Sequence, residues 1–368
     1  MEHATDRVAI VLEGEAQVRH VTANGVEQSF VTQPLRRIST MVRSFLDIES
    51  LLSPEVELRL TGPDLDATRS LQIDDTVREQ AARLMEARET KRAWLREHAV
   101  CPECRAALEH GPDLVRCANG HEFQQGGFGL DMLSGAIRDR AKLVPGLRVS
   151  RHAVDANGKG IIERTRERGG KVLDFGAGLK FAADYDPDVI ALDIEDYPTT
   201  DVVAAGQRLP FKDDTFEGVI SFSVLEHVSD PFACAAEIAR VLKPGGMICI
   251  GAPFLFQEHG YPEHYYNFSR RGLANLFEDK LEIVKQSPGA VSIPSLVRSF
   301  MSDIPPEHRE RWANVTLGDL WNGEKKLRPQ DQKLPPLPET IRWRFAHGSH
   351  IWATKPDPNV DPDDLDPS

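Results

Sequence analysis

The sequence lacks several features that would each place it in a large class of proteins. No apolar run approaches the length of about 18 residues that suggests a membrane-spanning helix. The start, MEHATDR, lacks the basic-then-apolar order of a secretion signal. Cysteine is scarce and odd in number, with five residues in 368, whereas an extracellular disulfide framework normally has an even, dispersed set. We therefore expect a cytoplasmic protein without a membrane span.

A surplus of positive charge is also missing. The chain has 44 Lys and Arg against 57 Asp and Glu, which gives a net charge of −13. A negative field of this kind repels phosphate backbones and disfavours broad binding of RNA. The hydrophobic content of 40% supports a sizeable core, and the length suits two or three domains.

Residues 1–74 alternate short apolar runs with turn signals and predict a small α+β region of unknown role. Strands are expected at 8–14, around 18–21, at 26–32 and at 56–62, and Asn24-Gly25 is a typical two-residue hairpin turn. The apolar spacing over 35–52 predicts an amphipathic helix.

Residues 75–100 predict a charged connecting helix that begins with a capping box formed by Thr76 and Glu79. Mixed charge of this kind is typical of a solvated helix. A face that contacts RNA is the alternative interpretation.

Residues 101–133 carry the strongest metal signal. Cys101 and Cys104 form one close pair, and Cys117 and His121 form a second. Three thiolates and one imidazole complete the tetrahedral set that Zn²⁺ accepts, so the spacing predicts a structural zinc ribbon with no open coordination position. His110 is the alternative fourth ligand.

The same segment resembles the zinc-binding module that precedes the methyltransferase domain of bacterial rRNA guanine-N1 methyltransferases. The likeness runs from Cys-Pro-x-Cys at 101–104 through Gly-His-x-Phe at 120–123 to the Gly-Phe and Leu-x-x-Leu pattern at 127–133. This resemblance implies methylation of a guanine base in rRNA as one possible function. The net charge and the sequence of 134–170, which does not continue that family's pattern, argue against it.

A glycine turn at 174–178 gives the strongest signal for a bound nucleoside. Asp174 lies at the end of an apolar strand, Gly176 and Gly178 follow it, and Asp193 ends a second apolar strand. A glycine turn followed by an acid about 20 residues later is the pattern that holds a ribose at the carboxyl edge of a parallel sheet. The complete G-x-G-x-x-G motif is missing, which disfavours NAD and FAD but leaves S-adenosylmethionine.

The stretch from 201 to 254 closely resembles class I S-adenosylmethionine-dependent methyltransferases. The matching pieces are Leu-Pro-Phe at 209–211, a strand at 218–222, Leu-Glu-His at 225–227, a helix from Pro231, and Leu-Lys-Pro-Gly-Gly at 242–246. The resemblance implies an α/β fold with a doubly wound, Rossmann-like sheet over 134–355. It also implies that the backbone around Leu209 lies near the adenine, with Asp174, Gly176, Gly178 and Asp193 as further cofactor residues.

Downstream, the sequence is similar to the methyltransferase subgroup associated with polysaccharide and cell-surface sugar biosynthesis. The matching residues of the loop that follows the fifth strand are His259, Pro262, Tyr265, Tyr266 and Phe268. The resemblance implies methyl transfer to a small molecule or glycan precursor, with a hydroxyl as the expected acceptor.

The chain departs from the family pattern at three positions. Ala205 stands where an acid usually binds the adenine amino group, His264 replaces an acid, and Asn267 replaces an arginine. These departures motivate a third hypothesis, a non-catalytic adaptor that binds the cofactor.

Histidine is the favoured general base for an oxygen or nitrogen acceptor, because its pKa lies near neutrality. The candidate catalytic residues are His227, His259 and His264. Residues 288–345, with three tryptophans, are expected to form an acceptor-specific insertion. The Asp- and Pro-rich tail, 356–368, is expected to be disordered.

Overall fold

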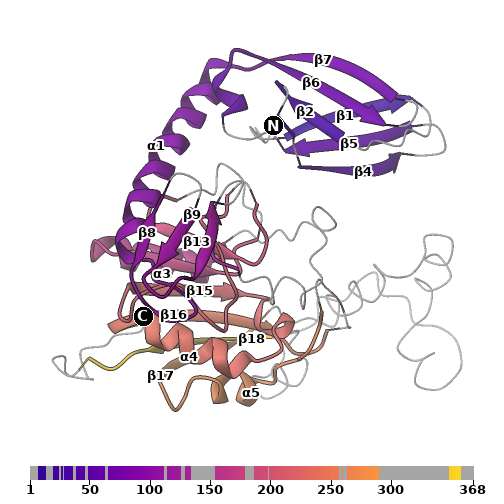
Figure 1. Ribbon diagram of the computed structural model, residues 1–368. Helices are drawn as coiled ribbons and strands as arrows, with labels where there is room; N and C mark the ends of the chain where they lie inside the picture. Colours follow the sequence, from indigo (N-terminus) through magenta and orange to yellow (C-terminus); the bar gives the residue numbers. More distant parts are fainter. Residues whose placement is uncertain are drawn as a thin grey trace, which may run out of the picture.

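The structure is a computed structural model of the chain. It describes residues 7–13, 20–24, 26–27, 29–35, 39–45, 49–62, 65–111, 114–125, 129–133, 154–178, 186–197, 199–256, 259, 263–289 and 348–357. Most of the expected acceptor insertion (290–347) and of the tail (358–368) lies outside these residues. A long helix, α1 (Asp75–His98), has the N-terminal strands at one end and the larger α/β body at the other (Figure 1).

The N-terminal region contains two antiparallel sheets. The first has the order β1-β5-β4 and the second β3-β2-β6-β7. The strands are β1 (Arg7–Glu13), β2 (His20–Ala23), β3 (Val26–Glu27), β4 (Ser29–Leu35), β5 (Ser39–Phe45), β6 (Glu55–Gly62) and β7 (Leu65–Gln72), with a 3₁₀ turn, η2 (Ser50–Leu52). In β6 every second side chain is buried, namely Val56, Leu58 and Leu60, as expected for a strand with one face on a core.

Strands occur near the expected positions, with the strand expected at 26–32 divided between β3 and β4 of different sheets, but the helix expected over 35–52 is wrong. Residues 39–45 form β5, whose backbone pairs with β1 on one side and β4 on the other. Pairing on both sides satisfies the backbone polar groups of β5, and this tertiary effect overrides the local helical spacing. The described part of residues 7–72 therefore contains strands and one 3₁₀ turn, without the α-helix that the α+β prediction included. The Asn24 turn is formed, with Asn24 at φ 48° and Ala23 paired to Val26.

Helix α1 begins one residue earlier than its predicted cap. The side chain of Asp74, and not that of Thr76, caps the helix by accepting the Thr76 amide at 2.8 Å. Near the other end, Lys91 Nζ lies 2.9 Å from Asp201 Oδ2, and both side chains are buried. This ion pair ties α1 to the α/β body.

The α/β body is built on a mixed sheet that contains the predicted strands. Its parallel part has the order β14-β13-β12-β15-β16, and β18 pairs antiparallel with both β16 and β17. The strands are β12 (Val172–Phe175), β13 (Val189–Asp193), β14 (Val202–Val203), β15 (Phe216–Phe222), β16 (Leu242–Pro253), β17 (Glu282–Pro288) and β18 (Gly348–Thr354). All four residues of β12 are buried, as is typical of a central parallel strand.

The segment 101–133, called the Cys-rich segment below, continues this same sheet. Its strands are β8 (Leu108–His110), β9 (Leu114–Cys117), β10 (Glu122–Gln125) and β11 (Leu130–Asp131). They are antiparallel to one another, and β11 pairs in parallel with β14 through Leu130↔Val202 and Asp131↔Val203. The Cys-rich segment thus shares the backbone hydrogen bonding of the α/β body.

Helices cover both faces of the sheet, which confirms the predicted doubly wound α/β fold. Helix α3 (Ala156–Glu167) buries Ile161 and Ile162 against Val172 and Ile220. Helix α4 (Pro231–Val241) and α5 (Arg270–Asn275) pack in a second core, which includes the strand residues Leu173 and Val219. Neighbouring residues of one strand point to opposite faces, so the two cores lie on opposite sides of the sheet.

No described helix combines the length and apolar character needed to cross a membrane.

Candidate functional site

The strand order reverses between β12 and β15. From β12 the chain passes to β13 and β14 on one side, and then returns to β15 and β16 on the other. In open α/β sheets, ligands bind outside the carboxyl ends of the strands at such a switch point. The site is therefore expected where the residues after β12 meet the residues after β15.

The glycine turn after β12 lies at this switch point. Gly176 and Gly178 have φ angles of +73° and +61°, which are left-handed and favour glycine. A Cβ atom on Gly176 would lie 2.3 Å from Cγ2 of Val224, the second residue after β15. The turn thus needs glycine both for its backbone conformation and for its close contact with the chain after β15.

Asp193, at the carboxyl end of β13, holds the glycine turn. Its Oδ2 accepts the Gly178 amide at 2.8 Å, and its Oδ1 accepts the Glu195 amide at 3.1 Å. Burial raises the pKa of Asp193, while the amide of Gly178 acts in the opposite direction. Asp174, buried within β12, lies in the strand next to Asp193. Four of the predicted cofactor residues therefore gather at adjacent strand ends.

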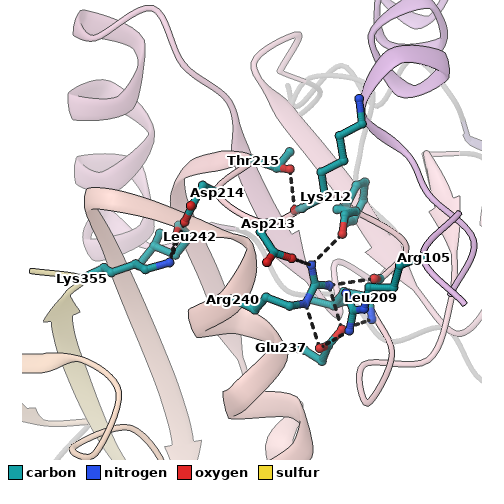
Figure 2. Close-up of polar contacts among 11 residues, drawn as sticks. Arg105, Leu209, Lys212, Asp213, Asp214, Thr215, Glu237, Arg240, Leu242 and Lys355 are labelled. Atoms are coloured by element: carbon teal, nitrogen blue, oxygen red, sulfur yellow. Dashed lines mark hydrogen bonds and ion pairs between the residues drawn. The ribbon is translucent and has the colours of Figure 1, made fainter. Parts of the chain in front are cut away.

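The fifth predicted cofactor residue, Leu209, lies in a loop whose backbone is fixed by helix α4. Its amide donates to Glu237 Oε2 at 2.8 Å, and its carbonyl accepts from Arg240 Nη2 at 3.0 Å. Figure 2 shows that Arg105 of the Cys-rich segment reaches the same carboxylate, with Nη2 2.7 Å from Glu237 Oε1. The loop is thus held from two directions.

Further contacts dock the end of α1 and the residue before the Cys-rich segment onto this loop. The Val100 amide donates to the Pro210 carbonyl at 3.0 Å, and the Lys212 amide donates to the His98 carbonyl at 3.2 Å.

Ala205, where the family pattern has an acid, is buried and offers the site no polar side chain.

The four predicted zinc ligands come together in the Cys-rich segment. The Cys104 and Cys117 sulfurs are 3.7 Å apart, and His121 Nδ1 lies 3.5 Å from the Cys101 sulfur and 3.4 Å from the Cys117 sulfur. Tetrahedral Zn²⁺ with ordinary bond lengths separates two sulfurs by about 3.8 Å, and a sulfur from a nitrogen by about 3.6 Å. These three distances match a tetrahedral zinc site, and all four ligand atoms lie within 4.8 Å of one another. His110, in β8, is not part of this group.

The electrostatics of the group suit a metal-bound thiolate. A hydrogen bond from the Ala106 backbone lowers the pKa of Cys104 to about 6. Burial raises the pKa of Cys101 to about 12, so this thiol needs a cation nearby to ionise.

The three predicted catalytic histidines also lie together. His227 ends η4 (Leu225–His227), the 3₁₀ turn after β15, and its ring centre is 5.0 Å from that of His259 and 5.8 Å from that of His264. The rings of His259 and His264 are 4.6 Å apart. Residues separated by more than 30 positions thus form one cluster, called the histidine cluster below.

The backbone contacts of the cluster assign two of the ring tautomers. His227 Nδ1 is 2.8 Å from the Glu263 carbonyl, which can only accept, so this nitrogen carries the proton. By the same argument His264 Nε2 donates to the Tyr266 carbonyl at 2.9 Å, while its Nδ1 accepts the His259 amide at 3.1 Å. Both nitrogens of His264 are therefore engaged with backbone groups. Tyr265 and Tyr266 are exposed beside the cluster.

Glu226 is the residue of this site that the sequence reasoning missed. Its side chain is fully buried next to His227, and burial raises its pKa to about 8. His227 Nε2 lies 3.7 Å from Glu226 Oε1. Its position after a strand and beside a candidate base was visible in the sequence, but the burial of its side chain depends on tertiary packing.

Residues 172–250 match the family model described as a methyltransferase domain. This segment is similar to methyltransferase domains. It contains the glycine turn, Asp193, the loop around Leu209 and His227. The Cys-rich segment, His259 and His264 lie outside the matched part of the chain.

Relatives similar to part of this chain occur in a fungus and in mycobacteria. The chain is 43% identical over 58 residues to an uncharacterised methyltransferase of Schizosaccharomyces pombe, covering 16% of this chain and 21% of that protein. It is 37% identical over 134 residues to one of Mycobacterium marinum, covering 32% of this chain and 50% of that protein. The chain thus spans half or less of the length of these relatives.

Solved structures similar to this chain include phosphoethanolamine N-methyltransferase 2 of Haemonchus contortus, determined with S-adenosylhomocysteine. The match has 15% identity and a TM-score of 0.31, and covers 51% of this chain and 49% of that protein.

Proposed function

We propose that the protein is an S-adenosylmethionine-dependent methyltransferase that acts on a small-molecule or glycan-precursor hydroxyl in the cytoplasm. The observation that carries the proposal is the contact of Asp193 with the Gly178 amide at the switch point, inside the segment that matches the methyltransferase domain. This geometry is suited to a ribose held against a glycine turn.

The cofactor would supply an electrophilic methyl group on a sulfonium sulfur. The residues proposed to hold it are Asp174, Gly176, Gly178, Asp193 and the backbone at Leu209. Asp193 would bind the ribose hydroxyls with the acceptor capacity that remains after it accepts the two backbone amides. The glycine turn allows close approach to the backbone, and the 209 loop would bound the adenine.

The acceptor would lie against the histidine cluster, since this cluster follows β15 at the same switch point. Methyl transfer is an in-line displacement, so most of the chain's contribution is to position the acceptor. A hydroxyl acceptor must also give up its proton as the new bond forms. Among the candidate general bases for this proton, His227 and His259 are better placed than His264, because both ring nitrogens of His264 are engaged with the backbone.

The Cys-rich segment would hold a structural Zn²⁺ through Cys101, Cys104, Cys117 and His121. The proposal is supported by the spacing of the four donor atoms, which matches a tetrahedral site. The proposed zinc would fix the residues around Arg105 and thereby the loop that carries Leu209.

The experiment is methyl transfer from radiolabelled S-adenosylmethionine into a host extract that is then divided into RNA, protein, and small-molecule plus glycan fractions. Label in the last fraction supports the proposal. Label in RNA favours methylation of a guanine base, which the resemblance of the Cys-rich segment motivates. Cofactor binding without transfer to any fraction favours the adaptor hypothesis, which Ala205 motivates.

A further inference from the structure

We propose that Glu226, His227 and His259 form a second metal site, which binds a divalent transition metal with Zn²⁺ as the best match. One ligand atom from each residue lies within 4.8 Å of the other two, and His227 Nε2 is 3.7 Å from Glu226 Oε1. The binding of the ion does not depend on the proposed function. It differs from the Cys-rich site in place and in ligand chemistry.

The carboxylate of Glu226 provides the first argument. The side chain is 0% exposed, and neither oxygen has a hydrogen-bond partner among the described residues. A buried polar group without a partner costs free energy, and an ionised one costs far more unless it is paired or coordinates a metal. A bound cation accounts for both unpartnered oxygens.

The orientation of His227 provides the second argument. Its Nδ1–H donates to the Glu263 carbonyl, which leaves Nε2 as the basic nitrogen, on the side of Glu226. Metal-binding histidines typically donate their other ring N–H to a carbonyl or carboxylate, which fixes the tautomer and the ring plane. His227 has this arrangement already.

Backbone contacts hold the three residues together. The Glu226 carbonyl accepts the amides of Tyr265 and Tyr266 at 2.7 and 3.3 Å, so the segment around 265 is fixed onto η4. His264, in the same segment, accepts the His259 amide at 3.1 Å. These hydrogen bonds to backbone groups thus hold the three proposed ligand residues near one another.

The ligand set indicates the kind of metal. Two imidazoles and one carboxylate are the ligands of catalytic zinc sites, in which a fourth position remains open. Imidazole nitrogen also disfavours Mg²⁺ and Ca²⁺, which take oxygen ligands. If the proposed function holds, the open position would take the acceptor oxygen, and His227 and His259 would act there as metal ligands in place of general bases. This extension alone rests on that function.

The test is metal binding by the full-length chain, first stripped of metal with a chelator and then titrated with Zn²⁺ and, separately, with Co²⁺. We expect two ions per chain. The Co²⁺ spectra distinguish the sites, because only the Cys-rich site gives thiolate-to-cobalt charge-transfer absorption. Glu226→Gln and His259→Ala should each reduce the stoichiometry to one, with that absorption unchanged. Cys104→Ser should remove the absorption and keep the second ion.

The matched control is Glu263→Gln, because the Glu263 side chain is exposed and the substitution keeps the backbone carbonyl that contacts His227. This variant should bind two ions. A wild-type chain that binds one ion, with the thiolate absorption, or two ions in both Glu226→Gln and His259→Ala, would overturn the site. Circular dichroism verifies the fold of each variant. If Glu226→Gln does not fold, the metal stoichiometry of His259→Ala decides the result, because His259 is partly exposed. Failure of methyl transfer would leave these stoichiometries unaffected and so concerns the proposed function only.

Discussion

Arg105 of the Cys-rich segment donates to Glu237 of α4 across 2.7 Å, and the other oxygen of that carboxylate accepts the Leu209 amide. Burial alone would raise the pKa of Glu237, but the guanidinium groups of Arg240 and Arg105 outweigh it and keep the pKa below its ordinary value. A single ionised side chain therefore connects the Cys-rich segment to the loop proposed to bound the adenine (Figure 2).

Replacing Glu237 should affect both stability and cofactor binding. Glu237→Gln puts an amide nitrogen where one oxygen now accepts hydrogen bonds from charged or backbone donors. We expect a loss of about 2 kcal/mol in the free energy of unfolding. Cofactor affinity should fall about tenfold, which corresponds to about 1.4 kcal/mol. Urea unfolding and calorimetric titration measure the two effects.

The control for this variant is Arg208→Ala. Arg208 pairs with Glu103 between the same two segments, but its side chain is more than half exposed. Exposed pairs contribute about 1 kcal/mol or less. Equal losses of stability in the two variants would contradict the role assigned to Glu237.

Loss of a zinc ligand should lower the zinc content of the chain and the stability of the Cys-rich segment. Cys104→Ser leaves three of the four donors, so the chain should retain one zinc fewer than wild type and the Cys-rich segment should unfold at lower temperature. His110→Gln, which alters the alternative ligand, should retain the wild-type zinc content. Full metal retention by Cys104→Ser, measured by elemental analysis, would exclude the proposed structural site.

The stability of the α/β body should fall on acidification through His350. Burial lowers the pKa of His350 in β18, and the charge of Asp155 offsets this only in part. The unfolded chain therefore takes up the proton first, so this contribution is complete above a pH of about 6.5 and is lost as the pH falls toward the lower folded value.

His350→Gln should flatten the stability profile between about pH 7 and pH 5. One proton can contribute a slope of at most about 1.4 kcal/mol per pH unit. Denaturant unfolding of wild type and variant across this range measures the difference. Parallel profiles for the two proteins would show that His350 does not titrate in this way.

Sequence patterns predicted the strands that border the proposed cofactor site because the relevant information there is local. The strands that end near Asp174 and Asp193 are short apolar runs followed by glycine or acid, and the structure has them at the predicted residues. The helix predicted over 35–52 was wrong because residues 39–45 pair as a strand with β1 and β4, which come from other parts of the chain. Glu226 was missed for a similar reason, since the burial of its side chain depends on tertiary packing and cannot be read from the local pattern.

The buried pair of Lys91 and Asp201 should be essential for docking α1. The two side chains are 2% and 4% exposed, and Asp201 Oδ2 also accepts the Ala191 amide at 2.8 Å. Lys91→Met leaves a buried carboxylate without its cation, which typically costs about 3 to 5 kcal/mol. The double variant with Asp201→Asn should lose less than Lys91→Met alone, because no buried charge is left. A larger loss in the double variant would contradict this account.

The most direct test of the central claim is calorimetric titration of the purified full-length chain with S-adenosylmethionine. The claim is that Asp193 and the glycine turn form the cofactor site. Wild type and Asp186→Ala, which alters an acid before the opposite end of β13, should bind the cofactor. Asp193→Ala should show no detectable binding. Unchanged affinity in Asp193→Ala would contradict the placement of the site.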